Sequence, residues 1–218
     1  MTEESRALVL DFGGVITRTL FETHPMTEKV LGLASGSLTW RGPFEPDSDP
    51  LWVAMQNGEL TEREYWTTRT QEVGEMVGES WTEMSQFLMA ARGNDPEPII
   101  RPEALTAFDE AREAGAQLAI LSNELDLFYG KGFAQKLSFI KYFEIVVDAT
   151  YTHILKPDPR AYRACVQQLD LPPEKCVFVD DQRRNVVGAQ RVGMQTVLFD
   201  VQQPQKSYRQ ALDLLWGE

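Results

Sequence analysis

Short apolar runs recur along most of the chain, and each is followed by polar or turn-forming residues. Near-continuous apolar runs of this length are typical of strands buried on both faces of a parallel sheet. The runs predict five strands, over residues 7–10, 118–122, 144–149, 175–179 and 196–199. Helical patterns lie between them, so the sequence predicts an α/β fold whose mainly parallel sheet is covered by helices on both faces.

Helix-stop and helix-start residues locate three helices of this core. A glycine directly follows the helices expected over 102–114 and around 188–192, and glycine is favoured just past a helix end. Asp158 is a suitable N-cap for a third helix over 159–169, which begins with proline.

Residues 19–94 have a different pattern, with little strand alternation and with aromatic residues and leucines at helical spacing. This pattern predicts a helical insertion. A first helix is expected over 51–57, where a glycine again follows it. Thr61 and Glu64 have the spacing of a capping box, which starts a second helix. A third helix is expected through 81–91.

The change in pattern divides the chain into two domains. We expect a core domain made of residues 1–18 and 95–218, and an inserted helical domain made of residues 19–94. Segment 94–98, which contains two prolines, is the expected connector back to the core. Tryptophans in the insertion can each bury a large area, so we expect them in its core rather than on a base-stacking surface. They are Trp40, Trp52, Trp66 and Trp81.

The composition is that of an ordinary globular protein. The 218 residues are 43% hydrophobic and 25% charged, which suits one sizeable core. No apolar run approaches the roughly 18 residues that span a bilayer, and the N-terminus lacks a leader pattern, so a cytoplasmic location is expected. The formal charge of −12 disfavours nucleic acid and anionic membranes as partners. Cys165 and Cys176 lack metal-site spacing and are expected to be buried, reduced thiols.

Polar side chains follow several of the predicted strands or precede helices. They are Asp11, Ser122, Asn123, Lys156, Asp180 and Asp181. The carboxyl ends of parallel strands share one edge of the sheet, where ligands bind. Three carboxylates gathered there repel one another unless a cation lies between them, and oxygen ligands suit Mg²⁺. A lysine can pair with a carboxylate nucleophile and an anionic substrate, while a serine hydroxyl and backbone amides can donate to phosphate oxygens. These residue types suit phosphoryl transfer to an aspartate.

In this order, the polar features resemble the motifs of the haloacid dehalogenase (HAD) superfamily. The resemblance covers nearly all of the chain and implies a Rossmann-like, three-layer α/β/α core. It also implies that residues 19–94 form a helical cap of the C1 type that closes over the site, and segment 58–66 resembles the cap of this branch. The implied activity is that of a Mg²⁺-dependent phosphatase acting on a small phosphorylated metabolite.

The resemblance also implies roles for the residues that handle the substrate. Asp11 is the nucleophile that becomes phosphorylated, a covalent step that carboxylates perform in related transferases. Lys156 orients Asp11 and neutralises charge. Ser122 and Asn123 bind the transferred group.

The implied metal site uses the remaining motif. Mg²⁺ is held by Asp11, by the backbone carbonyl of Gly13 and by Asp181. Asp180 acts directly or through water. Asn185 matches a position that often supports this motif, although an ordinary polar helix residue is an equally good interpretation.

Gly13 departs from the family pattern. Most phosphatases of the family carry a second Asp at this position as general acid and base, and such a group supplies about 10² to 10⁴ in rate. One consequence is a substrate whose leaving group needs little protonation, such as an anomeric sugar phosphate or an acyl phosphate. Another is an acid borrowed from the cap. Glu22 and His24 could reach the site if the cap folds over it, although both are expected at the surface.

Three further residues are expected to have structural or solvent-exposed positions rather than functional ones. His153 stands where this branch often has a small residue, and a partly buried structural position is favoured over a substrate contact. Arg183 and Arg184 follow the acidic pair on a helix, where exposure to solvent is favoured over an anion clamp.

Two other functions stay open at this point. A 2-haloacid dehalogenase would use Asp11 as nucleophile and needs no general acid, because a halide departs without a proton. The pair Asp180 and Asp181 argues against it, since dehalogenation of a carboxylate substrate needs no metal. A catalytically weak binding or regulatory protein is the third interpretation. We expect a monomer or a homodimer, for which the aromatic-rich insertion could supply the contact.

Overall fold

The computed structural model describes most of the chain, namely residues 5–92, 97–123 and 125–217. These residues form two compact units. The first, called the core unit below, comprises Met1–Arg18, Glu97–Asp126 and Gly132–Glu218. The second, called the helical unit, comprises Thr19–Pro96 and Leu127–Lys131. The first three residues of the expected connector, and residues 1–4 of the N-terminus, lie outside the described residues.

A five-stranded sheet forms the middle of the core unit, and every strand pair in it is parallel. The strand order is β3-β2-β1-β4-β5, so β1 is central, and its residues are fully buried. The strands are β1 (Ala7–Leu10), β2 (Gln117–Ser122), β3 (Ile145–Asp148), β4 (Cys176–Asp180) and β5 (Gln195–Leu198). All five predicted apolar runs therefore form strands of one parallel sheet.

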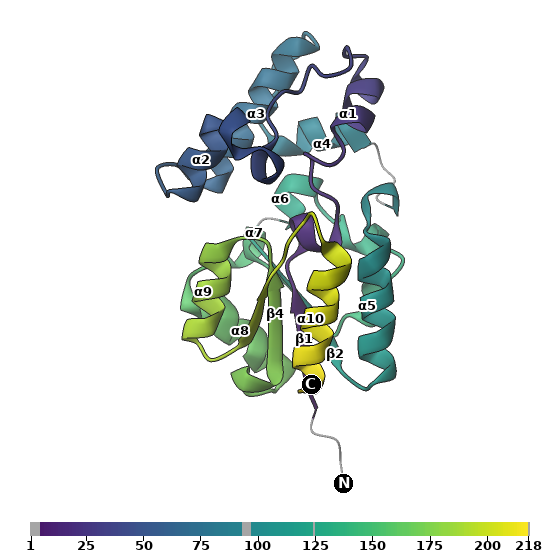
Figure 1. Ribbon diagram of the computed structural model, residues 1–218, viewed down its shortest axis with the longest axis vertical. Helices are drawn as coiled ribbons and strands as arrows, with labels where there is room; N and C mark the ends of the chain where they lie inside the picture. The colour runs from purple at the N-terminus through teal and green to yellow at the C-terminus, as the bar shows by residue number, and fades with distance from the viewer. Residues whose placement is uncertain (1–4, 93–96, 124, 218) are drawn as a thin grey trace. The chain divides into compact units, whose positions relative to one another are not determined.

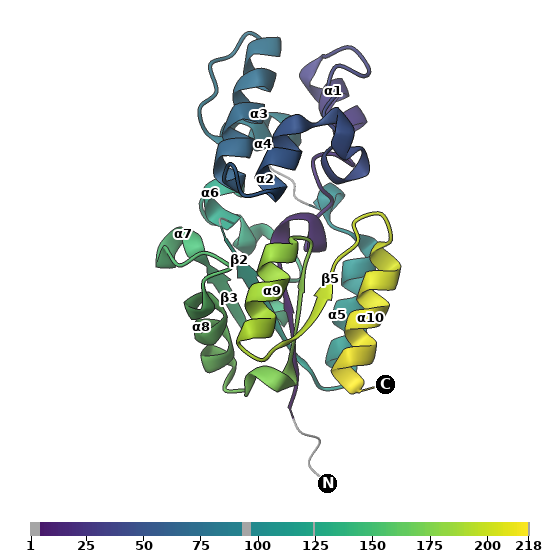
Figure 2. The ribbon, with the colours of Figure 1, turned by 60° about the vertical axis from the view of Figure 1, so that its left-hand side comes forward.

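Helices cover both faces of this sheet. The helices after residue 97 are α5 (Pro102–Glu113), α6 (Leu125–Tyr129), α7 (Ala149–Thr152), α8 (Pro159–Leu169), α9 (Arg183–Arg191) and α10 (Pro204–Trp216), and four of them lie against the sheet. Helices α5 and α10 pack on one face, and α8 and α9 pack on the other (Figures 1 and 2). This three-layer α/β/α architecture confirms the predicted fold class. Helix α10 was not among the predicted elements. In the described part of the chain, none of the helices combines the length and apolar character needed to cross a bilayer.

Close packing between α8 and α9 depends on one glycine. A Cβ atom at Gly188 would lie 2.8 Å from the hydroxyl oxygen of Tyr162 and 2.9 Å from the Cβ of Pro157. These distances are shorter than van der Waals contact, so a side chain at Gly188 would push the two helices apart.

Cys165 and Cys176 are buried free thiols near this contact, as predicted, and burial raises the pKa of each to about 12.

The helical unit contains α1 (His24–Leu31), α2 (Pro50–Gln56), α3 (Glu62–Met76) and α4 (Met84–Arg92). The predicted capping box is present, because Thr61 Oγ1 accepts from the Glu64 N–H at 3.2 Å and the Glu64 carboxylate accepts from the Thr61 N–H at 2.7 Å. Trp81 precedes α4 instead of lying within it. The side chain of Gln86 accepts from two backbone N–H groups at this point, which caps the helix after Trp81.

Aromatic rings form the core of the helical unit. Phe21 is central, with its ring centroid 5.2–6.4 Å from those of Trp40, Trp52, Tyr65 and Trp66. Trp81 is partly buried and stacks on Phe87 at 6.0 Å, so all four tryptophans pack into this core as predicted. Phe128 and Tyr129 pack against the same cluster, which explains why segment 127–131 joins this unit although its sequence position suggested the core.

His24 is buried beside these rings, so the expectation that it lies at the surface was wrong. Its side chain is 1% exposed, and its ring centroid lies 4.3 Å from that of Trp40 and 6.0 Å from that of Phe21. Burial, followed by the positive charge of Arg41, lowers the pKa of His24 to about 4. The folded chain therefore carries a neutral His24 at neutral pH.

We expect His24 to make the fold sensitive to acid. Between pH 6.5 and about 4, the unfolded chain binds a proton at His24 that the folded chain does not, so stability falls as the pH falls. The free energy of unfolding should drop by up to about 3 kcal/mol from this group. His24→Phe keeps an aromatic ring and should remove this contribution, as measured by urea unfolding across this pH range.

The matched control is His153→Asn, which changes the other histidine of the chain at an exposed position. Asparagine tolerates the positive φ of 57° found there. This variant should keep the wild-type dependence on pH. The same pH dependence in all three proteins would contradict the assignment.

Candidate active site

Asp11 lies directly after β1, at the carboxyl edge of the sheet. Its N–H donates to the carbonyl of Val179 at 2.9 Å, which extends the ladder between β1 and β4 past the end of the strand. The chain then turns through residues 12–16, where Gly14 has a φ of +80° that glycine adopts without strain. The Asp11 side chain is 13% exposed, so the carboxylate is still accessible from outside.

Lys156 joins two of the three carboxylates at this edge. Its Nζ donates to Asp11 Oδ1 at 2.8 Å and to Asp180 Oδ2 at 2.7 Å, and its side chain is only 1% exposed. Burial alone would lower the pKa of Lys156, but the charges of Asp11 and Asp180 outweigh burial and raise it above the ordinary lysine value. The ammonium therefore stays charged and forms ion pairs with both carboxylates.

Asp180 is fully buried, and protein donors occupy both of its oxygens. Oδ1 accepts from the Gln182 N–H at 2.7 Å, and Asn185 Nδ2 lies 3.1 Å from each oxygen. Asn185 thus contacts Asp180, in line with one of the two interpretations of its position. Asp181 is half-buried, and Asp11, Asp180 and Asp181 each bring a carboxylate oxygen into one group whose atoms all lie within 4.8 Å of one another. A group of hard oxygen atoms at this spacing fits a divalent cation such as Mg²⁺.

Asn123 ties the end of β2 to the Lys156 backbone. Its Oδ1 accepts from the Lys156 N–H at 2.6 Å, and its Nδ2 donates to the Lys156 carbonyl at 3.2 Å. The side chain therefore fixes the chain at Lys156. Ser122 is the last residue of β2 and is 7% exposed, next to Asn123 and on the strand beside β1.

Asp148 organises the chain that follows Asn123, and its role was missed from the sequence. Its carboxylate accepts from the N–H groups of Leu125 at 3.1 Å and Asp126 at 2.9 Å, and also from Thr150 at 2.9 Å. One buried side chain thus caps α6 and α7 together. The sequence signal was its place near the end of a predicted strand. The strand register now shows that it pairs with Ser122.

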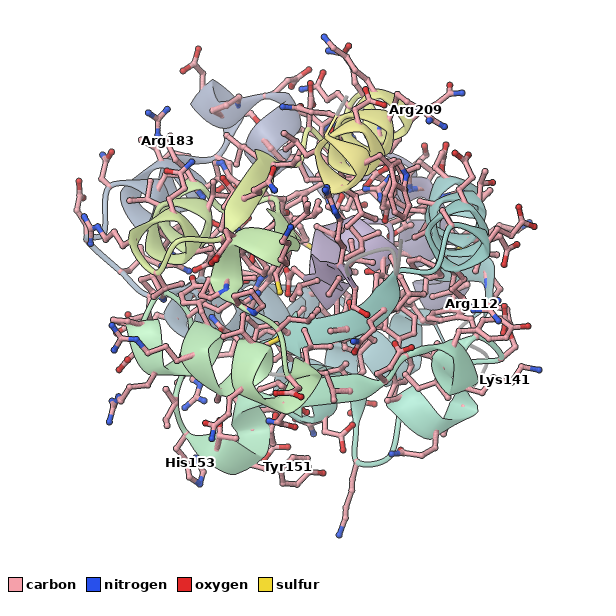
Figure 3. All side chains as sticks on the ribbon, turned by 90° about the horizontal axis from the view of Figure 1, so that it is seen from below. Arg112, Lys141, Tyr151, His153, Arg183 and Arg209 are labelled. Atoms are coloured by element: carbon pink, nitrogen blue, oxygen red, sulfur yellow. The ribbon has the colours of Figure 1, made fainter. Side chains whose placement is uncertain are left out.

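The structure also gives the surroundings of the other candidate residues. Glu22 binds the N–H and hydroxyl of Thr19 within the helical unit, at 2.8 and 2.9 Å. His153 ends α7 in a left-handed conformation and is exposed rather than partly buried. Figure 3 shows the side chains of His153 and Arg183 at the periphery of the molecule. Arg183 is exposed as predicted, whereas Arg184 is half-buried.

The family follows from a comparison with known proteins. A family model for haloacid dehalogenase-like hydrolases matches residues 5–193, most of the chain. The chain belongs to the haloacid dehalogenase-like hydrolases. This HAD membership confirms the resemblance inferred from the motifs.

Curated relatives of this HAD hydrolase include several named phosphatases. It is 28% identical to acyl-CoA dehydrogenase family member 10 of Mus musculus over 89% of the chain, but this match covers 18% of the mouse protein. It is 32% identical to phosphatase MT3486 of Mycobacterium tuberculosis over 45% of the chain and 46% of that protein. The chain therefore spans less than half the length of either relative. The sesquiterpene phosphatase astK of Aspergillus oryzae is 29% identical, with 87% of each chain covered.

Solved HAD structures share the fold. A subfamily IA hydrolase from Geobacter sulfurreducens has a TM-score of 0.60 at 18% identity, covering 97% of this chain and 96% of that one. A HAD enzyme from Bacteroides thetaiotaomicron, complexed with magnesium and inorganic phosphate, has a TM-score of 0.53 at 17% identity, covering 91% and 95%. An L-2-haloacid dehalogenase from Xanthobacter autotrophicus has a TM-score of 0.58 at 18% identity, covering 90% and 78%. This likeness establishes the fold alone.

We expect removal of the buried Lys156 ammonium to destabilise the protein. Lys156→Met leaves the Asp11 and Asp180 carboxylates without their shared partner, which should cost about 3 to 5 kcal/mol in the free energy of unfolding. Adding Asp180→Asn to this variant should restore part of the loss, because one buried charge is then removed. Urea unfolding without divalent metal measures both.

Arg209→Met serves as the control, because it breaks the exposed pair between Arg209 and Glu110. Its cost should stay below about 1 kcal/mol. Unchanged stability in Lys156→Met would show that the ion pairs around Lys156 do not stabilise the fold.

Proposed function

We propose that the protein is a Mg²⁺-dependent phosphatase that acts on a small phosphorylated metabolite through an aspartyl phosphate at Asp11. The observation that supports this best is the acidic group at the sheet edge, in which Lys156 bridges Asp11 and Asp180 and Asp181 lies alongside. The lysine leaves Asp11 ionised, as a nucleophile must be. The additional carboxylates can bind a cation. A metal-independent reaction would not require them.

The proposed reaction has two steps. An oxygen of Asp11 attacks the substrate phosphorus, the bond from phosphorus to the leaving-group oxygen breaks, and that oxygen takes a proton from solvent. Water then attacks the phosphorus of the aspartyl phosphate, and the bond from phosphorus to the Asp11 oxygen breaks. Inorganic phosphate leaves, a proton of the water passes to solvent, and the carboxylate of Asp11 is restored. Ser122 and the backbone at Asn123 donate hydrogen bonds to the phosphoryl oxygens, and Lys156 orients Asp11 throughout.

Asp11 and Asp181, with the Gly13 carbonyl, are the proposed Mg²⁺ ligands. Asp180 acts mainly by holding Lys156, since protein donors already engage both of its oxygens. Bound Mg²⁺ supplies charge neutralisation for the anionic phosphoryl group. The helical unit is proposed as the cap that selects the substrate. The cytoplasmic location and the monomeric or homodimeric state stay predictions.

Gly13 bears on the choice of substrate. It has no side chain to protonate a leaving group, so the proposal favours substrates whose leaving group is a weak base, such as an anomeric sugar phosphate or an acyl phosphate. A dehalogenase is less well supported, because its reaction needs no metal ion for the acidic group to bind. A weak binding protein would retain this group without turnover.

We expect phosphate release to require both Mg²⁺ and Asp11. A panel of sugar, acyl, nucleotide and aryl phosphates should yield inorganic phosphate with Mg²⁺ and none above background with a chelator. Asp11→Asn should lose at least about 10³-fold in kcat, because it removes the nucleophile. Halide release from 2-haloacids that is indifferent to chelation would instead identify a dehalogenase, and silence in both assays would favour a binding role.

We expect Gly13→Asp to change the preference among leaving groups. An added carboxyl group at this position can protonate a poor leaving group, so alkyl phosphates should gain more in kcat/KM than aryl or acyl phosphates, within the roughly 10² to 10⁴ that a general acid supplies. Gly13→Asn adds similar bulk without an acid and is the control. Equal changes across the substrate series would contradict this account of Gly13.

A further inference from the structure

The turn that follows the nucleophile is held by donors from distant parts of the core unit. Arg101 Nε donates to the Gly14 carbonyl at 3.1 Å, the Tyr208 hydroxyl donates to the Val15 carbonyl at 3.0 Å, and the Arg101 N–H donates to the Ile16 carbonyl at 3.0 Å. Three consecutive carbonyls are thus bound from outside the turn. Residues 12–16, which form this turn, are called the nucleophile loop below.

The two donors share one support. Arg101 directly precedes α5 and is 2% exposed, and Tyr208 lies on α10 and is 3% exposed. Phe199, just after β5, contacts both side chains. Its ring centroid is 5.5 Å from the Arg101 guanidinium carbon and 5.1 Å from the Tyr208 ring centroid. Burial raises the pKa of Tyr208, so its hydroxyl stays protonated and can donate.

The nucleophile loop needs such partners because it lacks regular hydrogen bonding. Gly13 and Gly14 have non-helical backbone angles, while four of the five loop residues are buried. Buried carbonyls that are not part of a helix or sheet must find donors elsewhere. Asp11 precedes the loop directly, and Gly13 supplies the carbonyl proposed as a metal ligand. Movement of the loop would therefore displace both.

We propose that Tyr208, with Arg101, is a positioning residue that sets the geometry of Asp11 and of the Gly13 carbonyl. The catalytic consequence rests on the proposed function. The bracing, meaning the hydrogen bonds that hold the nucleophile loop, does not depend on it. Tyr208 lies beyond residue 193, where the family model ends, so α10 contributes to the site a residue that the family match does not include. The final helix then serves the nucleophile as well as the sheet.

The test is Tyr208→Phe, which removes only the hydroxyl group. Its control is Tyr151→Phe, which removes a hydroxyl that binds Asp126 at 2.5 Å on an exposed side chain. Tyr208→Phe should speed amide hydrogen exchange in the peptide covering the nucleophile loop, and it should weaken Mg²⁺ binding about threefold or more in calorimetry with Mg²⁺ alone. It should lower kcat about tenfold with little change in KM, because small displacements at a reacting group are costly. Tyr151→Phe should match the wild type in all three.

A second variant guards against a general loss of folding. Arg101→Lys keeps the charge and the backbone donor but loses the Nε bond to Gly14, so its effect should have the same direction. Wild-type exchange and Mg²⁺ affinity in folded Tyr208→Phe would overturn the proposal. If the wild type releases no phosphate from any substrate, the proposed function fails, whereas faster exchange of the nucleophile loop in Tyr208→Phe would still support the bracing.

Discussion

The buried ammonium of Lys156 is the interaction on which the rest of the site depends. It lies within hydrogen-bond distance of Asp11 and Asp180, which come from neighbouring strands of the sheet. Two carboxylates this close would repel each other strongly without it. The lysine therefore makes a charged Asp11, the proposed nucleophile, compatible with a largely buried position. It also links the end of β4 to the residue that follows β1.

Much of the remaining structure holds Lys156 and Asp11 in place. Asn123 uses both ends of its carboxamide on the Lys156 backbone, whereas Asn185 contacts the Asp180 carboxylate with its amide nitrogen alone. In the loop that follows Asp11, Arg101 and Tyr208 bind successive carbonyls. The parallel sheet brings the strand ends to one edge, and these side chains convert that coarse placement into the defined geometry that catalysis requires.

The sequence predicted the sheet, and it placed polar residues after its strands, because both features have local signals. Buried parallel strands are continuous apolar runs, and the residues that follow them must share an edge. Helix α10 was not predicted, although it carries apolar residues at helical spacing, including Tyr208 and Leu212. Such a pattern also does not reveal which carbonyl a hydroxyl reaches. His24 was misplaced for a related reason. Only the folded helical unit brings Trp40 against its ring, and no local pattern indicates that contact.

The most direct test of the central claim is to identify the residue that carries the phosphoryl group during turnover. The protein would be mixed with Mg²⁺ and an aryl phosphate, quenched in acid within the first turnover, digested and examined by mass spectrometry. The account predicts a phosphoryl group on the peptide that contains Asp11, and its absence in Asp11→Asn or with a chelator. Phosphate release without any phosphoryl group on Asp11, or with one on another residue, would contradict the account.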